Sequence, residues 1–250
     1  RDQPKTAIER LAYFVAETEI APDTETICIV RDALIDTLGC ILAGASQPVA
    51  QQTQLTLSSW GSGLARALGT SLHLAAPWAA MANAVVGHAL DFDDWEMAGN
   101  THPSVVMFPA LLAVAADRPD DQPVSGQAIL EGYVAGFEVI ARIGEAVNLE
   151  HYARGWHSTA TIGSLGSAAA VARLMGLNRR QTAHALSISL SQAVGYTCQF
   201  GTDAKALQSG FAAKTGVLAA SLAQNGLTGQ AHVLEANTGF HHLMGHGDVG

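Results

Sequence analysis

Helical periodicity runs through nearly the whole chain, and it constrains the fold more than any other feature of this sequence. Apolar residues recur three and four positions apart, as they do on the buried face of a helix. These segments predict helices over 8–15, 27–41, 77–88, 105–115, 129–143, 185–193 and 211–222. No sustained alternation of period two, the mark of a half-buried strand, occurs among them. The sequence therefore predicts an all-α fold in which helices pack in layers.

Local signals refine the helix ends and the packing. Asn178 and Gln181 form a capping-box-like pair, and Ser104 can cap the helix that follows it. Gly132 and Gly136 lie four apart, which predicts that their helix approaches a neighbouring backbone closely. Two prolines and several acids and amides make 117–125 the clearest loop.

The chain of 250 residues is poor in charge for its size. Charged residues make up 14% and hydrophobic residues 48%, whereas about 25% charged is typical of globular domains. This balance predicts extensive burial, including a helical interface between two copies in a homodimer. The formal net charge of -9 argues against a nucleic-acid-binding protein, which would cluster its Lys and Arg residues.

Further signals bear on cellular location. Cys28, Cys40 and Cys198 are widely separated and suit a reducing compartment. The chain shows no apolar run of the roughly 18 residues that a membrane span needs, so we expect no membrane association. The first residues are polar and do not read as a secretory signal. We therefore expect a cytoplasmic protein.

Three carboxylates and two imidazoles gather between positions 88 and 104, in the stretches His88–Asp94 and Thr101–Ser104. A carboxylate that enters an apolar setting must find a partner, or its pKa rises. Such a grouping indicates a site for protons, a metal ion or a polar ligand. A helix end with solvated acids and a capping histidine is the structural alternative.

Five motifs, in order along most of the chain, resemble those of the MmgE/PrpD family. They are Ala67–Gly69 with Gly87–Asp94, Thr101–Ser104 with Pro109–Leu112, Arg154–Thr161, Gly201–Gly210 with Ala212-Ala213, and Gly226–Gly229 with Leu234-Glu235. The resemblance implies a large helical domain, a smaller α+β domain and a homodimer. The chain stops at Gly250, before that α+β domain would begin, so we expect 1–250 to be a single helical domain of a longer protein.

The resemblance also implies the chemistry. Members of the family act without a cofactor on small di- and tricarboxylates, by moving protons at carbon next to a carboxylate. This chemistry needs a base, an acid and cations that hold the carboxylates. It implies a lyase of the dehydratase or decarboxylase type with a polycarboxylate substrate and no metal or other cofactor.

Four residues match the family's active-site positions: Asp91, His102, His157 and Lys205. His102 is our candidate for the proton-transferring base, since an unperturbed imidazole titrates near neutrality. His157 precedes a predicted helix, whose free amides favour a carboxylate, so we expect it to bind substrate or act as an acid. We expect Asp91 to act as a catalytic or orienting acid and Lys205 to bind an anion.

Neighbouring residues complete the expected site, and the sequence differs from the family's motifs at two places within it. We expect substrate contacts from Thr101, Arg154 and Ser158. Trp95 stands where the family often has Thr. The family's Lys-Pro-Leu-His pattern reads Lys-Ala-Leu-Gln here, which ends on Gln208.

Other readings stay open at this point. The same proton chemistry would serve a racemase or epimerase of a dicarboxylate such as iminodisuccinate. A metal-dependent helical enzyme could place Asp91, Asp93 and Asp94 on magnesium, although no second acidic motif follows. His242 and His246, four apart, lack an acidic partner other than Asp248, and we expect no metal there. An inactive helical fragment could also serve only in assembly.

Overall fold

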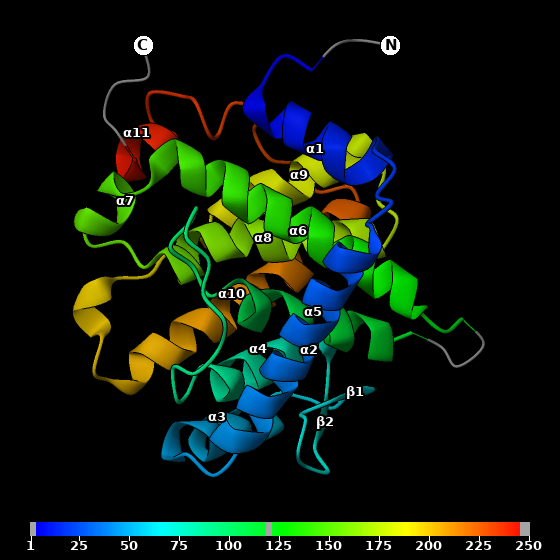
Figure 1. Ribbon diagram of the computed structural model, residues 1–250, viewed down its shortest axis with the longest axis vertical. Helices are drawn as coiled ribbons and strands as arrows, with labels where there is room; N and C mark the ends of the chain where they lie inside the picture. The colour runs from blue at the N-terminus through cyan, green and yellow to red at the C-terminus, as the bar shows by residue number, and fades with distance from the viewer. Residues whose placement is uncertain (1–3, 119–121, 246–250) are drawn as a thin grey trace.

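The chain folds as a set of packed α-helices, as the periodicity predicts (Figure 1). The computed structural model describes residues 4–118 and 122–245. The elements are α1 (Ala7–Glu17), α2 (Thr24–Gly44), α3 (Pro48–Ser58), β1 (Ala65–Arg66), β2 (His73–Leu74), α4 (Ala76–Gly87), α5 (Pro103–Ala116), α6 (Gly126–Val147), α7 (Glu150–Ala153), α8 (Ser158–Leu174), α9 (Arg179–Leu190), η1 (Thr197–Gln199), α10 (Asp203–Gln224) and α11 (Phe240–Met244).

Capping residues set most of the helix starts. The capping box at Asn178 is confirmed: its side chain accepts from the Gln181 amide, and the Gln181 side chain accepts in return. The expected cap at Ser104 is wrong, because α5 begins at Pro103 and His102 occupies the N-cap position. The Ser104 hydroxyl instead lies between the Asp94 carboxylate and the Tyr133 hydroxyl.

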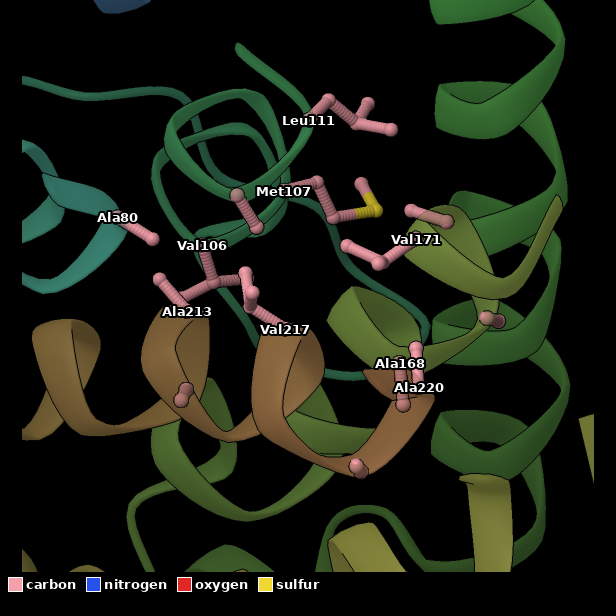
Figure 2. Packing of buried hydrophobic residues seen from close by; sticks show 14 of the residues in the cluster. Ala80, Val106, Met107, Leu111, Ala168, Val171, Ala213, Val217 and Ala220 are labelled. Carbon is pink, nitrogen blue, oxygen red and sulfur yellow. The ribbon is translucent and has the colours of Figure 1, made fainter. Parts of the chain in front are cut away.

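Helix α8 lies at the centre of the fold. All its residues except Arg173 are buried, because α5, α6, α9 and α10 surround it. Figure 2 shows part of this core, where Val106 and Met107 of α5 meet Val171 of α8 and Val217 of α10. Many of the core side chains are alanines, so the helices approach one another closely. The layered all-α architecture expected from the sequence is therefore confirmed.

The two glycines of α6 make the close approach that their spacing predicts. A Cβ at Gly136 would lie 2.6 Å from the carbonyl oxygen of Gly166 in α8, and one at Gly132 would lie 3.0 Å from that of Ala170. A side chain at Gly136 would push α6 away from α8, so this helix pair depends on hydrogen at that position.

A small antiparallel hairpin is among the elements that the periodicity misses, together with α3, α8 and the short α7, η1 and α11. Strands β1 and β2 pair Ala65 with Leu74 and Arg66 with His73, and two residues are too short to show alternation. The Asn83 side chain of α4 holds the hairpin through the Leu68 amide and the Arg66 carbonyl. Among the described residues, no helix combines the length and the apolar character that crossing a membrane requires.

Candidate active site

Four helix ends converge on the acidic and histidine-rich cluster. His88 ends α4, His102 and His157 stand at the N-caps of α5 and α8, and Lys205 lies in the first turn of α10. Three of these ends are N-termini, where unpaired amides and the helix dipole favour negative charge. The sequence gathers carboxylates here, and the fold surrounds them with donors.

Asp91 and Lys205 form an ion pair at the edge of the cluster. The Lys205 Nζ lies 2.5 Å from Asp91 Oδ1, and the His102 Nε2 lies 3.7 Å from the same oxygen. Burial opposes ionisation of Asp91, but the hydrogen bond and charge of Lys205, with His88 and His102, together outweigh it and lower the pKa of this carboxyl. The backbone of Asp91 has a φ of 58°, in the left-handed region that Asp tolerates better than most residues.

Asp93 is buried between two imidazoles. It lies 2.9 Å from His88 Nδ1 and 3.3 Å from His102 Nδ1, and the His102 Nδ1 also lies 3.2 Å from the Asp93 carbonyl oxygen. Burial opposes its ionisation, but hydrogen bonds from His102 and His88 dominate, so the pKa of Asp93 is far below its usual range. Asp93 is therefore a fixed negative charge at the centre of the site.

His102 takes its orientation and its charge from Asp93. Burial disfavours the charged ring, but the hydrogen bonds and charge of Asp93, with the charge of Asp91, together outweigh burial and raise the pKa of His102 above its ordinary value. The backbone amide of His102 donates to Thr159 Oγ1 in α8 at 3.1 Å. The Nδ1 face is thus held within the protein, and Nε2 is the nitrogen left on the Asp91 side.

His157 has the opposite environment. Its ring is buried against Phe200 and stacks on His88, with ring centroids 6.0 Å apart in the second pair. Nδ1 lies 2.6 Å from Gln208 Oε1. Burial lowers the pKa of His157 to about 4, against the opposing effect of the Gln208 bond. His102 also packs on His88, at a centroid distance of 4.8 Å, so the fold brings both candidate histidines together.

Asp94, next in sequence, belongs to a different contact set. Its carboxylate accepts from the Ser104 amide at 3.2 Å and from the Ser104 hydroxyl, which is 2.7 Å from the Tyr133 hydroxyl. Burial raises the pKa of Asp94 to about 6, against the effect of the Ser104 bonds. Asp94 therefore ties the loop before α5 to the helices.

The three expected substrate contacts lie in different settings. The Thr101 hydroxyl donates to Glu96 Oε1 at 2.6 Å, and the Arg154 Nη1 donates to the Gly245 carbonyl at 2.5 Å. The Thr101 hydroxyl proton is therefore used within the protein, whereas the bond to Gly245 uses one of the five N–H donors of Arg154, so the substrate contact expected of Arg154 stays a prediction. The Ser158 hydroxyl, in contrast, is fully buried and has no hydrogen-bond partner among the described residues.

A hollow of about 660 Å³ opens beside the cluster. Its lining includes His88, Asp91, Phe200, Asp203 and Lys205. A second hollow of about 980 Å³ lies between α1 and α9 and contains none of the expected site residues. The smaller hollow is the one that adjoins the buried cluster of Asp93, His102 and His157, and a hollow beside buried groups with shifted pKa values is the usual setting of an active site.

The acids do not support a magnesium site formed by Asp91, Asp93 and Asp94. In the described part of the chain, the group whose ligand atoms lie within 4.8 Å of one another is His88, Asp91, Asp93 and His102. Asp94 is not in it, and the Lys205 ammonium already contacts Asp91. His246 and Asp248, the other candidate metal ligands, lie outside the described residues.

Sequence reasoning missed several contributors to the cluster. The sequence gives Asp93 a role only as a possible magnesium ligand, yet its carboxylate contacts both His88 and His102. Phe200 carries no polar signal, but its ring packs against His157 and lies 5.1 Å from the Lys205 Nζ. Gln208 stands three residues after Lys205, on the same side of α10, and that spacing could have identified it.

Comparison with known proteins identifies the family to which the chain belongs. The MmgE/PrpD N-terminal domain matches residues 9–249. The cis-aconitate decarboxylase of Homo sapiens is 34% identical over 218 residues, which cover 83% of this chain and 44% of that protein. The cis-aconitate decarboxylase of Aspergillus terreus is 31% identical over 210 residues, 82% of this chain and 43% of that protein. The chain thus spans about half the length of the curated relatives it matches, and it belongs to the MmgE/PrpD family.

Proposed function

We propose that the natural full-length protein is a lyase of the decarboxylase or dehydratase type that acts on a small di- or tricarboxylate. The observation that carries this proposal is the cluster in which His102 and His157 pack on His88 next to the Asp91–Lys205 pair, and His88, Asp91 and Lys205 of that cluster line one hollow. Its volume of about 660 Å³ is ample for a small polycarboxylate. The printed names of the relatives, cis-aconitate decarboxylases, support a tricarboxylate.

Lys205 is the proposed carboxylate ligand. An ammonium has three N–H donors, so Lys205 can keep Asp91 and still donate to a substrate oxygen. It stands in the first turn of α10, where the helix dipole adds attraction for an anion. Lys205 is 20% exposed at its side chain, so a bound carboxylate would meet a partly desolvated cation.

His102 is the proposed proton-transferring residue. In decarboxylation, a carbon–carbon bond breaks, carbon dioxide leaves, and the electron pair moves to a carbon that takes up one proton. In dehydration, a C–H proton is removed and the hydroxyl leaves with a proton as water. Asp93 favours the protonated form of His102, so His102 can supply a proton near neutral pH and can recover it in a later step.

Two further groups have proposed supporting roles. Asp91 orients Lys205 and lies beside the His102 Nε2, where it would stabilise the imidazolium. The unpartnered Ser158 hydroxyl, in the first turn of α8, is a proposed donor to a substrate oxygen. An unsatisfied buried hydroxyl is costly, and a ligand oxygen would remove that cost.

Proton NMR in deuterated buffer tests the proposal with the full-length chain and a panel of di- and tricarboxylates. A lyase changes the carbon skeleton or saturation of one substrate and incorporates deuterium. Exchange at the α-carbon with the skeleton unchanged would indicate the racemase or epimerase alternative. His102→Gln should reduce turnover by roughly 100-fold or more, the usual range for a positioned acid or base. Absence of both exchange and turnover across the panel would refute the proposal.

We also propose that the protein is a homodimer. Helix α2 presents an outward apolar stripe in which Ile27, Ile35 and Leu42 are 40%, 61% and 66% exposed. Large exposed apolar patches mark interaction surfaces. Static light scattering of the full-length chain at micromolar concentration should give the mass of two chains, and a monodisperse monomer would contradict the proposal.

A further inference from the structure

The Gln208 amide has both of its ends tied. Its Oε1 lies 2.6 Å from His157 Nδ1, and its Nε2 donates to the Tyr196 carbonyl oxygen at 3.2 Å. Gln208 and His157 are 6% and 3% exposed, so water contributes little to either contact. Gly195 permits this approach, because a Cβ at that position would lie 2.9 Å from Gln208 Oε1.

The backbone around the two side chains fixes the direction of the amide. The His157 amide donates to the Gly195 carbonyl at 2.9 Å, and Trp156 pairs with Tyr196 in an isolated antiparallel bridge. The Tyr196 carbonyl can only accept, so the NH₂ group of Gln208 must face it. The opposite end of the amide, which faces the imidazole, must then be the oxygen.

An amide oxygen can only accept a hydrogen bond, and this determines which nitrogen of the His157 ring carries the hydrogen. In the neutral imidazole, one nitrogen carries hydrogen and the other carries a lone pair. With Gln208 Oε1 at Nδ1, the hydrogen must be on Nδ1 and the lone pair on Nε2. No hydrogen bond occupies His157 Nε2 among the contacts of the described residues.

We propose that Gln208 is a positioning residue that holds His157 in its Nδ1-protonated tautomer, so that Nε2 acts as the proton acceptor of the site. The inference rests on the proposed function and reverses the role expected from the sequence. A neutral ring with a lone pair at Nε2 cannot donate to a carboxylate or act as an acid. It can accept a hydrogen bond from a substrate hydroxyl or take a proton from carbon.

The charges around His157 keep the ring neutral. The groups that face it are His88 at the end of α4, His102 at the start of α5 and Lys205 on α10. All three are neutral or positive, and they add to burial in disfavouring the imidazolium. Asp93, the negative charge nearest the histidines, contacts His88 and His102 instead.

Two imidazoles with opposite settings thus divide the proton transfer. Asp93 favours the charged ring of His102, and the uncharged Gln208 leaves the ring of His157 neutral. Titratable groups whose surroundings separate their pKa values are the usual arrangement of an acid and a base. In this arrangement Lys205 binds the substrate carboxylates. His157 Nε2 then favours a substrate that has a C–H or O–H group next to those carboxylates.

The test reads the His157 ring directly. Long-range proton–nitrogen NMR of the full-length protein, labelled with ¹⁵N-histidine, reports which ring nitrogen carries hydrogen, and His157→Gln assigns the signal. The wild-type protein should show hydrogen on Nδ1 and none on Nε2 between pH 6 and 8. Hydrogen on Nε2, or a charged ring at pH 7, would overturn the inference whatever the activity of the enzyme.

Two substitutions separate positioning from simple packing. Gln208→Glu keeps the shape and adds a negative charge, so His157 should become protonated at neutral pH and the acid limb of kcat/KM should move to higher pH. Gln208→Met keeps the length without a strong acceptor and should lower kcat by about 100-fold or more with little change in KM. If Gln208→Met fails to fold, the shift of the acid limb of kcat/KM in Gln208→Glu is sufficient to test the positioning role.

Gln192 provides a matched control. Its Oε1 accepts from Thr215 at 3.5 Å and it is exposed, so Gln192→Met should leave the His157 signals and the kinetics unchanged. If Gln208→Glu leaves both the pH profile and the His157 signals as in the wild type, the positioning role is refuted. A wild-type protein with the expected tautomer but no turnover of any carboxylate supports the tautomer assignment and refutes the proposed function.

Discussion

Asp93→Asn is the sharpest perturbation of the proposed site, because one carboxylate serves two imidazoles. Asp93 accepts from the Nδ1 atoms of both His88 and His102. Both rings contact the same oxygen, Asp93 Oδ2, and Asp93 Oδ1 also lies 3.0 Å from His88 Nδ1. With the asparagine oxygen at the Oδ2 position, both rings keep an acceptor, but the negative charge is lost and an NH₂ donor lies beside His88 Nδ1.

The size of the effect follows from these contacts. Without the negative charge of Asp93, only the charge of Asp91 and the backbone carbonyl of residue 93 still oppose burial, so the pKa of His102 should fall. We expect kcat/KM to drop by roughly 10²- to 10⁴-fold, the range for a mispositioned proton-transfer group. The limb of the pH profile that His102 sets should move to lower pH. KM should change little, because Asp93 is buried and does not line the hollow.

Steady-state kinetics of the full-length enzyme across pH 5 to 9 measures both effects. Asp94→Asn is the matched control, since Asp94 is also a buried acid but contacts Ser104 rather than a histidine. It should retain kcat/KM within about threefold, since no proton-transfer group loses a partner. Wild-type kinetics and an unshifted pH limb in Asp93→Asn would refute the view that Asp93 controls His102.

Three further outcomes are expected. Lys205→Ala should raise KM or lower turnover with little change in unfolding free energy, and Lys205→Arg should rescue only part of the loss, because guanidinium differs in reach and shape; wild-type kinetics in the alanine variant would assign Lys205 to the surface. Asp94 has a folded pKa of about 6 against a reference of 3.8, so its favourable contribution to folding is present below pH 4 and lost as pH rises through 6. Relative to Asp94→Asn, the wild type should therefore lose up to roughly 3 kcal/mol across that window in urea unfolding, and a constant difference would contradict the buried setting. Gly136→Ala should cost about 1–3 kcal/mol in the same assay, because its Cβ would meet the Gly166 carbonyl at 2.6 Å; an unchanged unfolding midpoint would show that α6 can shift away from α8.

The helices themselves could be predicted from the sequence, because their information is local. Apolar spacing predicted most of the long helices, although not α3 or α8, and the Asn178–Gln181 capping box predicted the start of α9. The spacing of Gly132 and Gly136 predicted a close helix contact before any partner was known. The short β1–β2 hairpin could not be predicted from the sequence, since two-residue strands have no periodicity to detect.

The family followed from motifs, and the motifs also identified the residues that the fold brings together. Asp91, His102, His157 and Lys205 come from four separate segments and meet at one cluster. Thr101 shares those motifs, yet its hydroxyl donates to Glu96 within the protein. A motif marks a segment, but it does not say which of its side chains face the ligand.

Only the tertiary structure decided which atom of each side chain meets which partner. Asp93 and Asp94 are neighbours in sequence, yet one carboxylate contacts two imidazoles and the other contacts Ser104. Their pKa values shift in opposite directions for that reason. The tautomer of His157 likewise depends on Gln208, which is distant in sequence and is itself held by the Tyr196 carbonyl. The sequence alone determined the helices and the family, whereas charge and proton position depend on contacts between distant segments that only the packed helices create.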